Sequence, residues 1–329
     1  MPEIYEFLRE MRLIIGGLLV LCAGIAQSSL ADPARFAPGA ISVNGRATLS
    51  PGFSPDGMTA YFTQSECASI PRCPQHLYVS RLEDGTWTRG ERIEKLGNYR
   101  VDWPSVTPDG RQLILTWTAP RTKYKDLDII TNFDLYRLDL DEAAAMPVPF
   151  EGSDINRPRA GKLKTRRAFH VQSAGIITLA GDLYFWDERE DAVGERDVFI
   201  APGDGKGGFE AARPLPAPIN STGRDHHSWV SPGGGLMFVS YPDRGGLGED
   251  DIFVSRKGND GWSKPVSLGP LVNSPYPDFA ARLTPDGLQL VFTSSRPFGD
   301  RGPGLYQVWS VATSDLIETG VLTNEDLDR

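Results

Sequence analysis

A short turn that ends in glycine recurs five times along this 329-residue chain, and an apolar stretch follows it each time. Steps of 53, 71, 53 and 53 residues separate the turn glycines, which are Gly57, Gly110, Gly181, Gly234 and Gly287. Four of the turns read Ser/Thr-Pro-Asp/Gly-Gly, whereas the turn at Gly181 lacks the proline. A fixed period of this length is typical of repeat architectures, so we expect each repeat to fold as one unit of supersecondary structure.

Each repeat contains the same succession of short apolar segments. Three apolar residues begin three positions after the turn glycine, as at 113–115, 237–239 and 290–292, and a second strand follows a loop, as at 197–200 and 251–254. A tight glycine-containing turn then leads to an aromatic residue that opens a further strand. An asparagine stands eleven residues beyond three of these aromatics, and the asparagines and their counterparts in the less regular repeats are Asn98, Asn220, Asn273, Asn156 and Asn44.

Four antiparallel strands per repeat, no helical periodicity and abundant glycine and proline predict an all-β fold, a five-bladed β-propeller with one blade per repeat. The last repeat lacks its outer strand, and the segment 36–44 resembles the missing part. We therefore expect the N-terminal strand to complete the final blade and close the ring, which leaves no open sheet edge. The 18 extra residues between Gly110 and Gly181 are too few for a sixth blade and are expected to lengthen loops around 119–133 and 157–169.

The Pro-Asp-Gly turns, the strands after them and the Asp-Ile-Phe triplet at 251–253 resemble the TolB-like, WD-like propeller repeat, whose motif reads S-P-D-G, strand, D-I-Y. The resemblance is closest over 220–255 and extends over nearly all of 32–329. It implies a propeller in which the Pro-Asp-Gly residues are structural. It implies little about activity, because this fold hosts many unrelated functions.

The N-terminal region has the layout of a secretory signal peptide. An apolar run at 13–26 follows Arg12, and Ser29-Leu30-Ala31 forms a small-x-small cleavage site before Asp32. Three glutamates among residues 1–10 favour Met11 as the start of translation. We predict that residues 1–31 are removed and that residues 32–329 form a single propeller domain, periplasmic or secreted.

Charge and cysteine content narrow the partners and the compartment. The chain carries 34 basic and 43 acidic side chains, and removal of residues 1–31 leaves 32 and 40, a net charge of −8. An acidic surface without a basic cluster argues against nucleic acid and anionic membranes as partners. No second long apolar run follows, so we expect no membrane insertion after cleavage, and we expect a monomer. Cys67 and Cys73 are predicted to form one disulfide in an oxidising compartment, with two unpaired thiols as the alternative.

Acidic residues precede several turns, where the inner strands of a propeller begin at the mouth of the central channel. Asp225 and Asp278 both stand nine residues before their turn glycine, and Asp102 stands eight before its own. One interpretation is a ring of carboxylates that holds a cation or sugar hydroxyls. The other is that each carboxylate accepts hydrogen bonds from backbone amides at the strand start. Recurrence favours the structural interpretation, because a repeated structural role repeats its residue.

The pair His226-His227 occurs once, beside Arg224 and Asp225, in a chain with four histidines. Neighbours in a strand point to opposite faces, so we expect one of the two to reach a ligand. Such a histidine can act as a base or metal ligand together with Asp225 or His170. The alternative is a half-buried, hydrogen-bonded histidine. Propeller-shaped pectin lyases related to this repeat class use channel histidines and a metal, but no complete ligand set is visible here.

The sequence favours a propeller that binds a protein, peptide or glycan through one face, without catalysis and without a cofactor. The expected ligand-binding residues at the channel mouth are Asp102, Arg224, Asp225, His226, His227 and Asp278. The alternative is a carbohydrate-active hydrolase or lyase with His226, His227 and Asp225 as its catalytic residues and a divalent metal as an open option. Five-bladed glycosidases of the arabinanase type need acidic residues from different blades, which Asp102, Asp225 and Asp278 can supply. Most strand aromatics are expected in the core between blades, namely Trp103, Phe185, Trp229, Phe238 and Phe292.

Overall fold

The structure is a computed structural model. It describes residues 30–49, 51–68, 73–119, 122–124, 127–129, 133–156, 171–189, 192–242, 244–299, 302 and 304–329. The chain divides into two units, Met1–Ala31 and Asp32–Arg329, and every described strand belongs to the second. Residues 1–29 of the predicted signal peptide and His170 lie outside the described residues.

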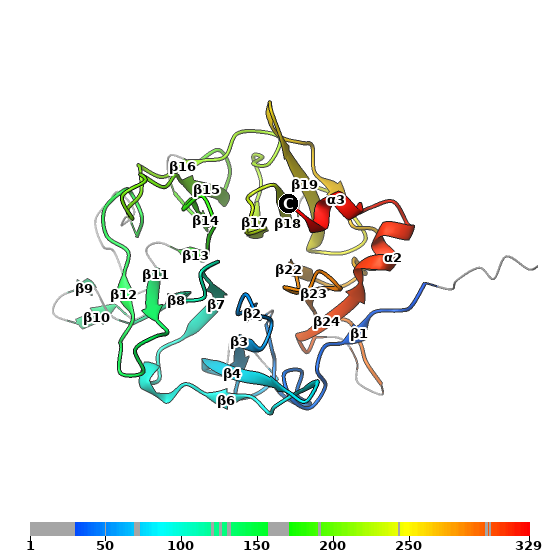
Figure 1. Ribbon diagram of the computed structural model, residues 1–329, viewed down its shortest axis with the longest axis horizontal. Helices are drawn as coiled ribbons and strands as arrows, with labels where there is room; N and C mark the ends of the chain where they lie inside the picture. The colour runs from blue at the N-terminus through cyan, green and yellow to red at the C-terminus, as the bar shows by residue number, and fades with distance from the viewer. Residues whose placement is uncertain are drawn as a thin grey trace, which may run out of the picture. The chain divides into compact units, whose positions relative to one another are not determined.

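Five small antiparallel sheets stand in a ring, so the unit Asp32–Arg329 is the five-bladed β-propeller that the repeat predicts (Figure 1). In each blade the strand that follows the connection from the preceding blade is innermost. The strands of blade 1 are β2 (Gly52–Phe53), β3 (Thr59–Ser65), β4 (Gln75–Glu83), β5 (Thr86–Trp87) and β6 (Glu91–Arg92). Those of blade 2 are β7 (Val101–Val106), β8 (Gln112–Trp117), β11 (Asp134–Asp139) and β12 (Val148–Pro149).

The remaining blades repeat this order from the inside outward. The strands of blade 3 are β13 (Gln172–Ile177), β14 (Leu183–Asp187), β15 (Asp197–Ala201) and β16 (Arg213–Pro214). Those of blade 4 are β17 (His226–Val230), β18 (Leu236–Tyr241), β19 (Asp251–Gly258), β20 (Gly261–Trp262) and β21 (Val266–Ser267). Blade 5 consists of β22 (Asp278–Leu283), β23 (Gln289–Ser294), β24 (Gln307–Ala312) and the N-terminal strand β1 (Ala34–Arg35).

The N-terminal strand closes the ring, as the sequence predicts, but the strand is Ala34–Arg35 rather than the segment 36–44, which forms mainly turns. Ala34 pairs with Ser310 and Arg35 with Trp309, so β1 lies antiparallel beside β24 (Figure 1). The amide of Phe36 continues the pairing by donating to the carbonyl of Val308 at 2.8 Å. Blade 5 is therefore assembled from both ends of the domain, and its outer strand is supplied by the N-terminal end.

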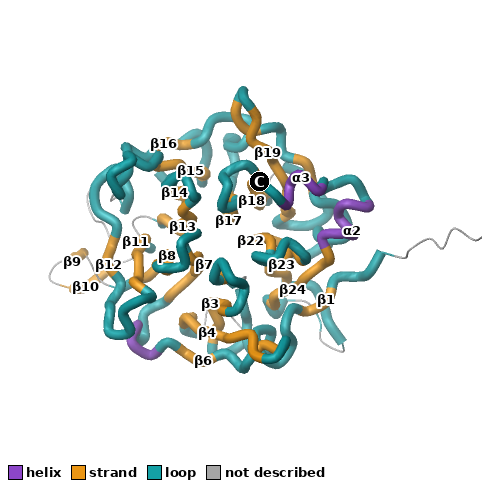
Figure 2. The backbone as a smooth tube through the Cα atoms, viewed as in Figure 1, coloured by secondary structure: helices purple, strands orange, loops and turns teal. Residues whose placement is uncertain are grey.

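Two segments lie outside the blade pattern. The 71-residue step includes a small antiparallel ribbon, β9 (Thr122–Tyr124) and β10 (Leu127–Ile129), within the longer loop expected there. After β24 the chain forms two short helices that the strand pattern does not predict (Figure 2). Helix α2 (Thr313–Glu318) lies beside β24 of blade 5, and α3 (Asn324–Leu327) lies beside β19 of blade 4, where Asp326 pairs with Arg256. A single 3-10 turn, η1 (Glu94–Leu96), follows blade 1. Within the described residues, no helix has the length and apolar character that crossing a membrane requires.

The apolar core lies between neighbouring blades. Phe238 of blade 4 and Phe292 of blade 5 belong to one buried cluster, and Trp229 stacks on Phe238 at a ring-centroid distance of 5.6 Å. Phe185 belongs to the cluster between blades 2 and 3. Burial of such large rings supplies most of the favourable free energy of a fold of this kind. Four of the five aromatics expected between blades are found there, and Trp103 is the exception described below.

The recurring turn is explained by its backbone geometry. All five turn glycines have positive φ, between 69° at Gly287 and 85° at Gly181, a conformation in which a side chain is disfavoured. The preceding polar residues lock the turn. In the first one, the amide of Met58 donates to Asp56 Oδ1 at 2.9 Å and the amide of Thr59 donates to Ser54 Oγ at 2.9 Å. The Pro-Asp-Gly residues are therefore structural, in agreement with what the resemblance implies.

Three of the recurring asparagines act as clamps on the third strand of their blade. Asn220 Oδ1 accepts from the amide of Val198 at 2.9 Å, while its Nδ2 donates to the carbonyls of Val198 and Leu215 at 2.9 and 2.7 Å. Asn156 and Asn273 bind the amide and carbonyl of Leu135 and Ile252 in the same way. Asn98 is exposed instead and accepts a hydrogen bond from Arg92.

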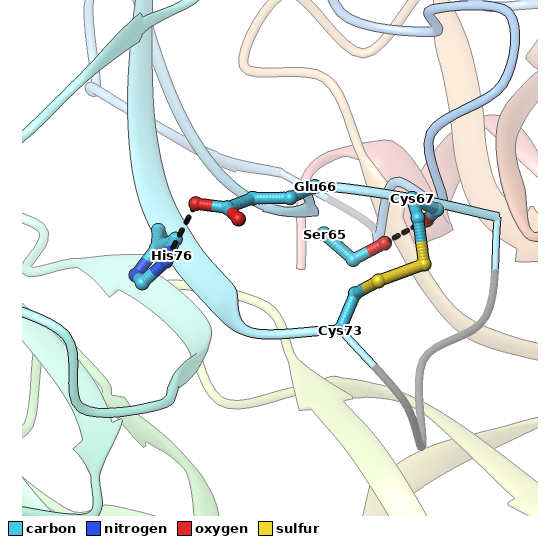
Figure 3. The surroundings of a disulfide bond; sticks show 5 residues. All are labelled: Ser65, Glu66, Cys67, Cys73 and His76. Carbon is cyan, nitrogen blue, oxygen red and sulfur yellow. Dashed lines mark hydrogen bonds and ion pairs between the residues drawn. A yellow bond between two sulfur atoms is a disulfide. The ribbon is translucent and has the colours of Figure 1, made fainter.

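The predicted disulfide is present. Cys67 and Cys73 are joined, and their Cα atoms lie 5.8 Å apart (Figure 3). The bridge staples the connection between β3 and β4 on blade 1. Beside it, Glu66 contacts the buried His76 at 3.3 Å between Oε1 and Nε2 (Figure 3). Disulfide bonds such as the one between Cys67 and Cys73 persist in oxidising compartments.

We expect the change Asn220→Ala to lower the free energy of unfolding by about 2–4 kcal/mol, because the amide and carbonyl of Val198 would stay buried without their partners. Asn98→Ala is the matched control, and as an exposed change it should stay within about 0.5 kcal/mol of the parent protein. Urea unfolding measures both values. Similar losses for the two variants would contradict the clamp.

Candidate binding site at the channel mouth

A backbone hydrogen bond between neighbouring blades fixes where the inner strands begin. In four blades, the donor is the backbone amide of the residue nine positions before the turn glycine. The acceptor belongs to the preceding blade and is the carbonyl of the residue just before its third strand. The donor–acceptor pairs are Thr48–Tyr306, Gln172–Phe133, Asp225–Arg196 and Asp278–Asp250, at 2.7–3.0 Å. These bonds tie four of the five blades to their neighbours at the end of the ring where the inner strands begin. We call this end of the ring the channel mouth.

Two residues further along, the inner strands of four blades carry the same β-bulge. The residue seven positions before the turn glycine has a left-handed backbone, with φ of 52° at Trp103, 57° at Ala174, 49° at His227 and 56° at Ala280. The pairing register shifts at each of these points. Such φ values are uncommon for residues other than glycine, and a bulge re-aims the side chains around it.

The bulges bring aromatic rings from four blades together around the axis of the ring. We name this group, Trp103, Trp186, His226, His227 and Phe279, the axis cluster. The His227 ring lies 4.6 Å from Trp103, 4.8 Å from Phe279 and 4.1 Å from His226 between centroids. Trp186 lies 5.9 Å from His227. Trp103 therefore packs at the axis rather than between blades.

The two histidines do not point to opposite faces, as regular strand alternation predicts. The bulge at His227 interrupts the alternation, so the two rings lie against each other. His226 is 4% exposed, and its Nε2 lies 3.2 Å from Asp250 Oδ1. Burial lowers the pKa of His226, with the Asp250 carboxylate acting in the opposite direction. The imidazole is thus neutral at pH 7, with its Nε2 facing the Asp250 carboxylate.

His227 keeps part of its surface accessible although it lies deep in the ring. Burial lowers the pKa of His227 well below 6.5, and the neighbouring His226 and Arg196 act in the same direction. Its Nδ1 has no hydrogen-bond partner among the described residues, and the same holds for Nδ1 of His226. The pair therefore offers two neutral imidazoles with unused ring nitrogens.

Charged side chains of both signs surround the axis cluster. Arg196 donates from Nε to Glu188 at 3.1 Å, and its guanidinium lies 4.4 Å from the centre of the Trp186 ring. Arg100 donates from Nε to Asp102 at 2.6 Å. Burial raises the pKa of Asp102, while the Arg100 guanidinium acts in the opposite direction. Arg224, which the sequence places at the mouth, is exposed. Its backbone pairs with that of Arg196 in an isolated parallel β-bridge.

The two equivalent carboxylates have the structural role. Asp225 accepts a hydrogen bond from Ser221 Oγ at 2.9 Å and lies 3.6 Å from Arg244. Asp278 accepts from the amide of Ser274 at 2.6 Å and from Arg296 at 2.8 Å. Both carboxylates are completely buried. Burial raises the pKa of Asp225, although its hydrogen bonds act in the opposite direction.

The structure thus brings together some of the expected site residues and separates others. His226 and His227 belong to the axis cluster, whereas Asp225 and Asp278 are held by serines four residues before them. Asp102 is equivalent to His226 and not to Asp225. Asp102 and His226 each stand immediately before the bulge residue of their blade, whereas Asp225 stands two residues before it. Among the described residues, no three His, Cys, Asp or Glu side chains gather closely enough to hold a metal ion.

Sequence reasoning missed Trp186, Phe279, Asp250 and Arg196. Phe279 and His226 both stand eight residues before a turn glycine. Comparing the equivalent positions of the repeats would therefore have identified Phe279 as a neighbour of the site. Asp250 and Arg196 immediately precede third strands, and only the interblade hydrogen bonds show that this position reaches the mouth. Trp186 resembles any other apolar strand residue in the sequence.

No family model matches the sequence, and no curated protein matches it. Among solved structures, a glycoside hydrolase superposes with a TM-score of 0.55 and 8% identity, covering 86% of this chain and 91% of its own. TolB from Acinetobacter baumannii gives a TM-score of 0.45 and 16% identity over 80% of this chain. A tricorn protease gives 0.45 and 15% over 74% of this chain. The chain spans 54% of TolB and 20% of the tricorn protease. At these identities the likeness concerns the propeller fold alone.

The depressed histidine pKa values predict a loss of stability in mild acid. The pKa of His227 in the folded protein lies below its unfolded value of about 6.5, so the unfolded chain binds the additional proton. Its contribution to stability is complete above pH 6.5 and falls as the pH drops below that value, at up to about 1.4 kcal/mol per pH unit. His227→Asn, which tolerates the left-handed backbone, should reduce this slope between about pH 6.5 and pH 5. Urea unfolding across that range measures it, and equal slopes would contradict the burial of His227.

Proposed function

We propose that this chain is an exported β-propeller that binds a protein, peptide or glycan at its channel mouth without catalysing a reaction. The observation that carries the proposal is the state of the acidic residues. Asp225 and Asp278, which a hydrolase of this shape would need at its centre, are buried and hydrogen-bonded to serine and arginine. Carboxylates held in this way support the fold and are poorly placed to reach a substrate.

The side chains that surround the axis cluster favour a polar ligand with charges of both signs. Arg196, Glu188, Arg224 and Asp250 are half-buried or exposed, and the fold does not require any of them at its repeated positions. The aromatic rings beneath them are nearly covered, so a sugar ring has little flat surface on which to stack. Complementary charge gives specificity in recognition, and this arrangement supports a protein or peptide ligand over a glycan.

A specific observation favours the second candidate, a carbohydrate-active hydrolase or lyase. His226 Nε2 lies 3.2 Å from Asp250 Oδ1, and the His227 ring lies against the His226 ring. A histidine held by a carboxylate is a common arrangement of a general base, and depressed pKa values cluster at functional sites. In this candidate, one of the two histidines removes a proton from a substrate bound at the mouth.

Intrinsic fluorescence can test the binding proposal, because Trp103 and Trp186 belong to the axis cluster and a ligand at the mouth should perturb them. We expect charged peptides from a defined panel to change the emission, and the double change Arg196→Gln and Asp250→Asn to weaken binding by about tenfold or more. Arg111→Gln is the control and should bind as the parent does, because Arg111 is an exposed residue of the turn that follows β7 and is paired with Asp141. Equal affinity of the double variant and the parent would contradict a ligand at the mouth.

The same preparations distinguish binding from turnover. Oligosaccharides incubated with the parent protein and with His226→Gln should remain intact in both cases, as judged by mass spectrometry. Cleavage by the parent that is lost in His226→Gln would contradict the non-catalytic proposal and support the hydrolase or lyase.

Export is supported by the disulfide between Cys67 and Cys73 and by the signal-peptide layout of residues 1–31. On expression of the full chain in a bacterium with a periplasm, we expect the protein in the periplasmic fraction or the medium, with Asp32 as its first residue. The intact mass after separation of the fractions measures both points. A protein that keeps residues 11–31 in the cytoplasmic fraction would contradict export.

A further inference from the structure

One buried cation on the innermost strand of blade 5 is explained neither by the repeat nor by the contacts at the mouth. Arg282 lies on the inner strand β22, five residues before Gly287, and is 6% exposed. The corresponding residues of blades 3 and 4 are Ile176 and Trp229, both apolar. The fold therefore does not need a charge at this position.

The guanidinium of Arg282 contacts the inner strand of blade 2. Its Nη1 donates to the carbonyl of Pro104 at 3.3 Å. The inner strand of blade 1 makes room for this contact, because Gly52 has no side chain and a Cβ there would lie 2.4 Å from the same carbonyl oxygen. Among the described residues, no carboxylate lies within ion-pair distance of Arg282.

The unused edge of the guanidinium has a defined shape. Nε is buried and has no hydrogen-bond partner, and the described part of the protein gives no acceptor to Nη2. The N–H groups of Nε and Nη2 point in parallel from one edge of the group, whereas Nη1 uses another edge for Pro104. Two parallel donors match the two oxygens of a carboxylate.

The charge persists in this environment. Burial lowers the pKa of Arg282 to about 10, which leaves the guanidinium protonated at neutral pH. A buried charge without a counter-ion is strongly disfavoured, and buried polar groups without partners are rare in folded proteins. An anion on the free edge would remove both penalties at once.

We propose that Arg282 anchors an anion site among the inner strands of the ring, where a carboxylate binds bidentately to its Nε and Nη2. The site lies two residues further along the inner strand than the bulge residue Ala280, past the layer that holds the axis cluster. It is separate from the ligand site proposed at the mouth and does not depend on it.

Thermal unfolding of the whole domain in mixtures of sodium gluconate and sodium formate tests this site. Formate is the smallest carboxylate, whereas gluconate is bulky, and exchanging one for the other keeps the ionic strength constant. We expect the unfolding midpoint to rise with formate and to saturate, as it does for any ligand that binds only the folded state. Arg282→Met should weaken the apparent affinity for formate by about tenfold or more, and Arg111→Met should leave it unchanged.

A parent protein whose midpoint is indifferent to formate would overturn the proposal, whatever the variants do. An unchanged response in Arg282→Met would overturn it as well. If that variant does not fold, Arg282→Lys keeps the charge without the fork, and its formate affinity should still fall. Tri-alanine with a free C-terminus, compared with its amide, shows whether a carboxylate on a larger ligand also enters. A response to formate alone, or to formate and the tripeptide acid, supports the site. A stabilisation by the tripeptide amide as large as that by the tripeptide acid contradicts it.

Discussion

A single backbone hydrogen bond between adjacent blades positions the start of the inner strands, and the architecture of the mouth depends on it. In four blades the donor stands nine residues before the turn glycine, and the acceptor is the carbonyl that precedes the third strand of the blade before. In blades 3, 4 and 5 the strand between this bond and the positive-φ turn glycine accommodates one extra residue as a bulge. Blade 2 carries the same bulge, although Val101 makes no such bond within the described residues. The bulge then aims the side chains of His227 and Trp103 at the axis rather than between blades.

The repeat specifies the backbone, and the side chains that differ at equivalent positions specify the chemistry. At the donor position, Asp225 and Asp278 recur with the same serine partners, which indicates a structural role. At the bulge, alanine suffices in blades 3 and 5, whereas His227 in blade 4 is singular. Arg282 is singular in the same sense, five residues before its turn glycine. These exceptions are the residues on which the binding proposals depend.

Much of the fold was predictable because its causes are local or periodic. The turn glycines require positive φ, the strands repeat with them, and the unmatched last repeat indicated closure by the N-terminal segment, which β1 confirms. The disulfide was expected from two cysteines and an oxidising compartment. The recurring asparagines were visible as a pattern, although their clamping of the third strand was not, and Asn98 shows that the same spacing can lack that role.

The candidate site was predictable only in part, because it depends on a departure from regular strand geometry. Alternation of side chains fails at the bulge, so the contact between the rings of His226 and His227 could not be read from their adjacency. Asp250 reaches His226 across blade 4, where β17, β18 and β19 lie side by side, and no local pattern in the sequence records this contact.

Native-state hydrogen exchange tests most directly whether this pairing holds the ring and its mouth together. The amides of Thr48, Gln172, Asp225 and Asp278 should exchange only through global unfolding, with the same free energy of opening as the slowest strand amides. Exchange of these four amides through local openings several kcal/mol below that level would contradict the account.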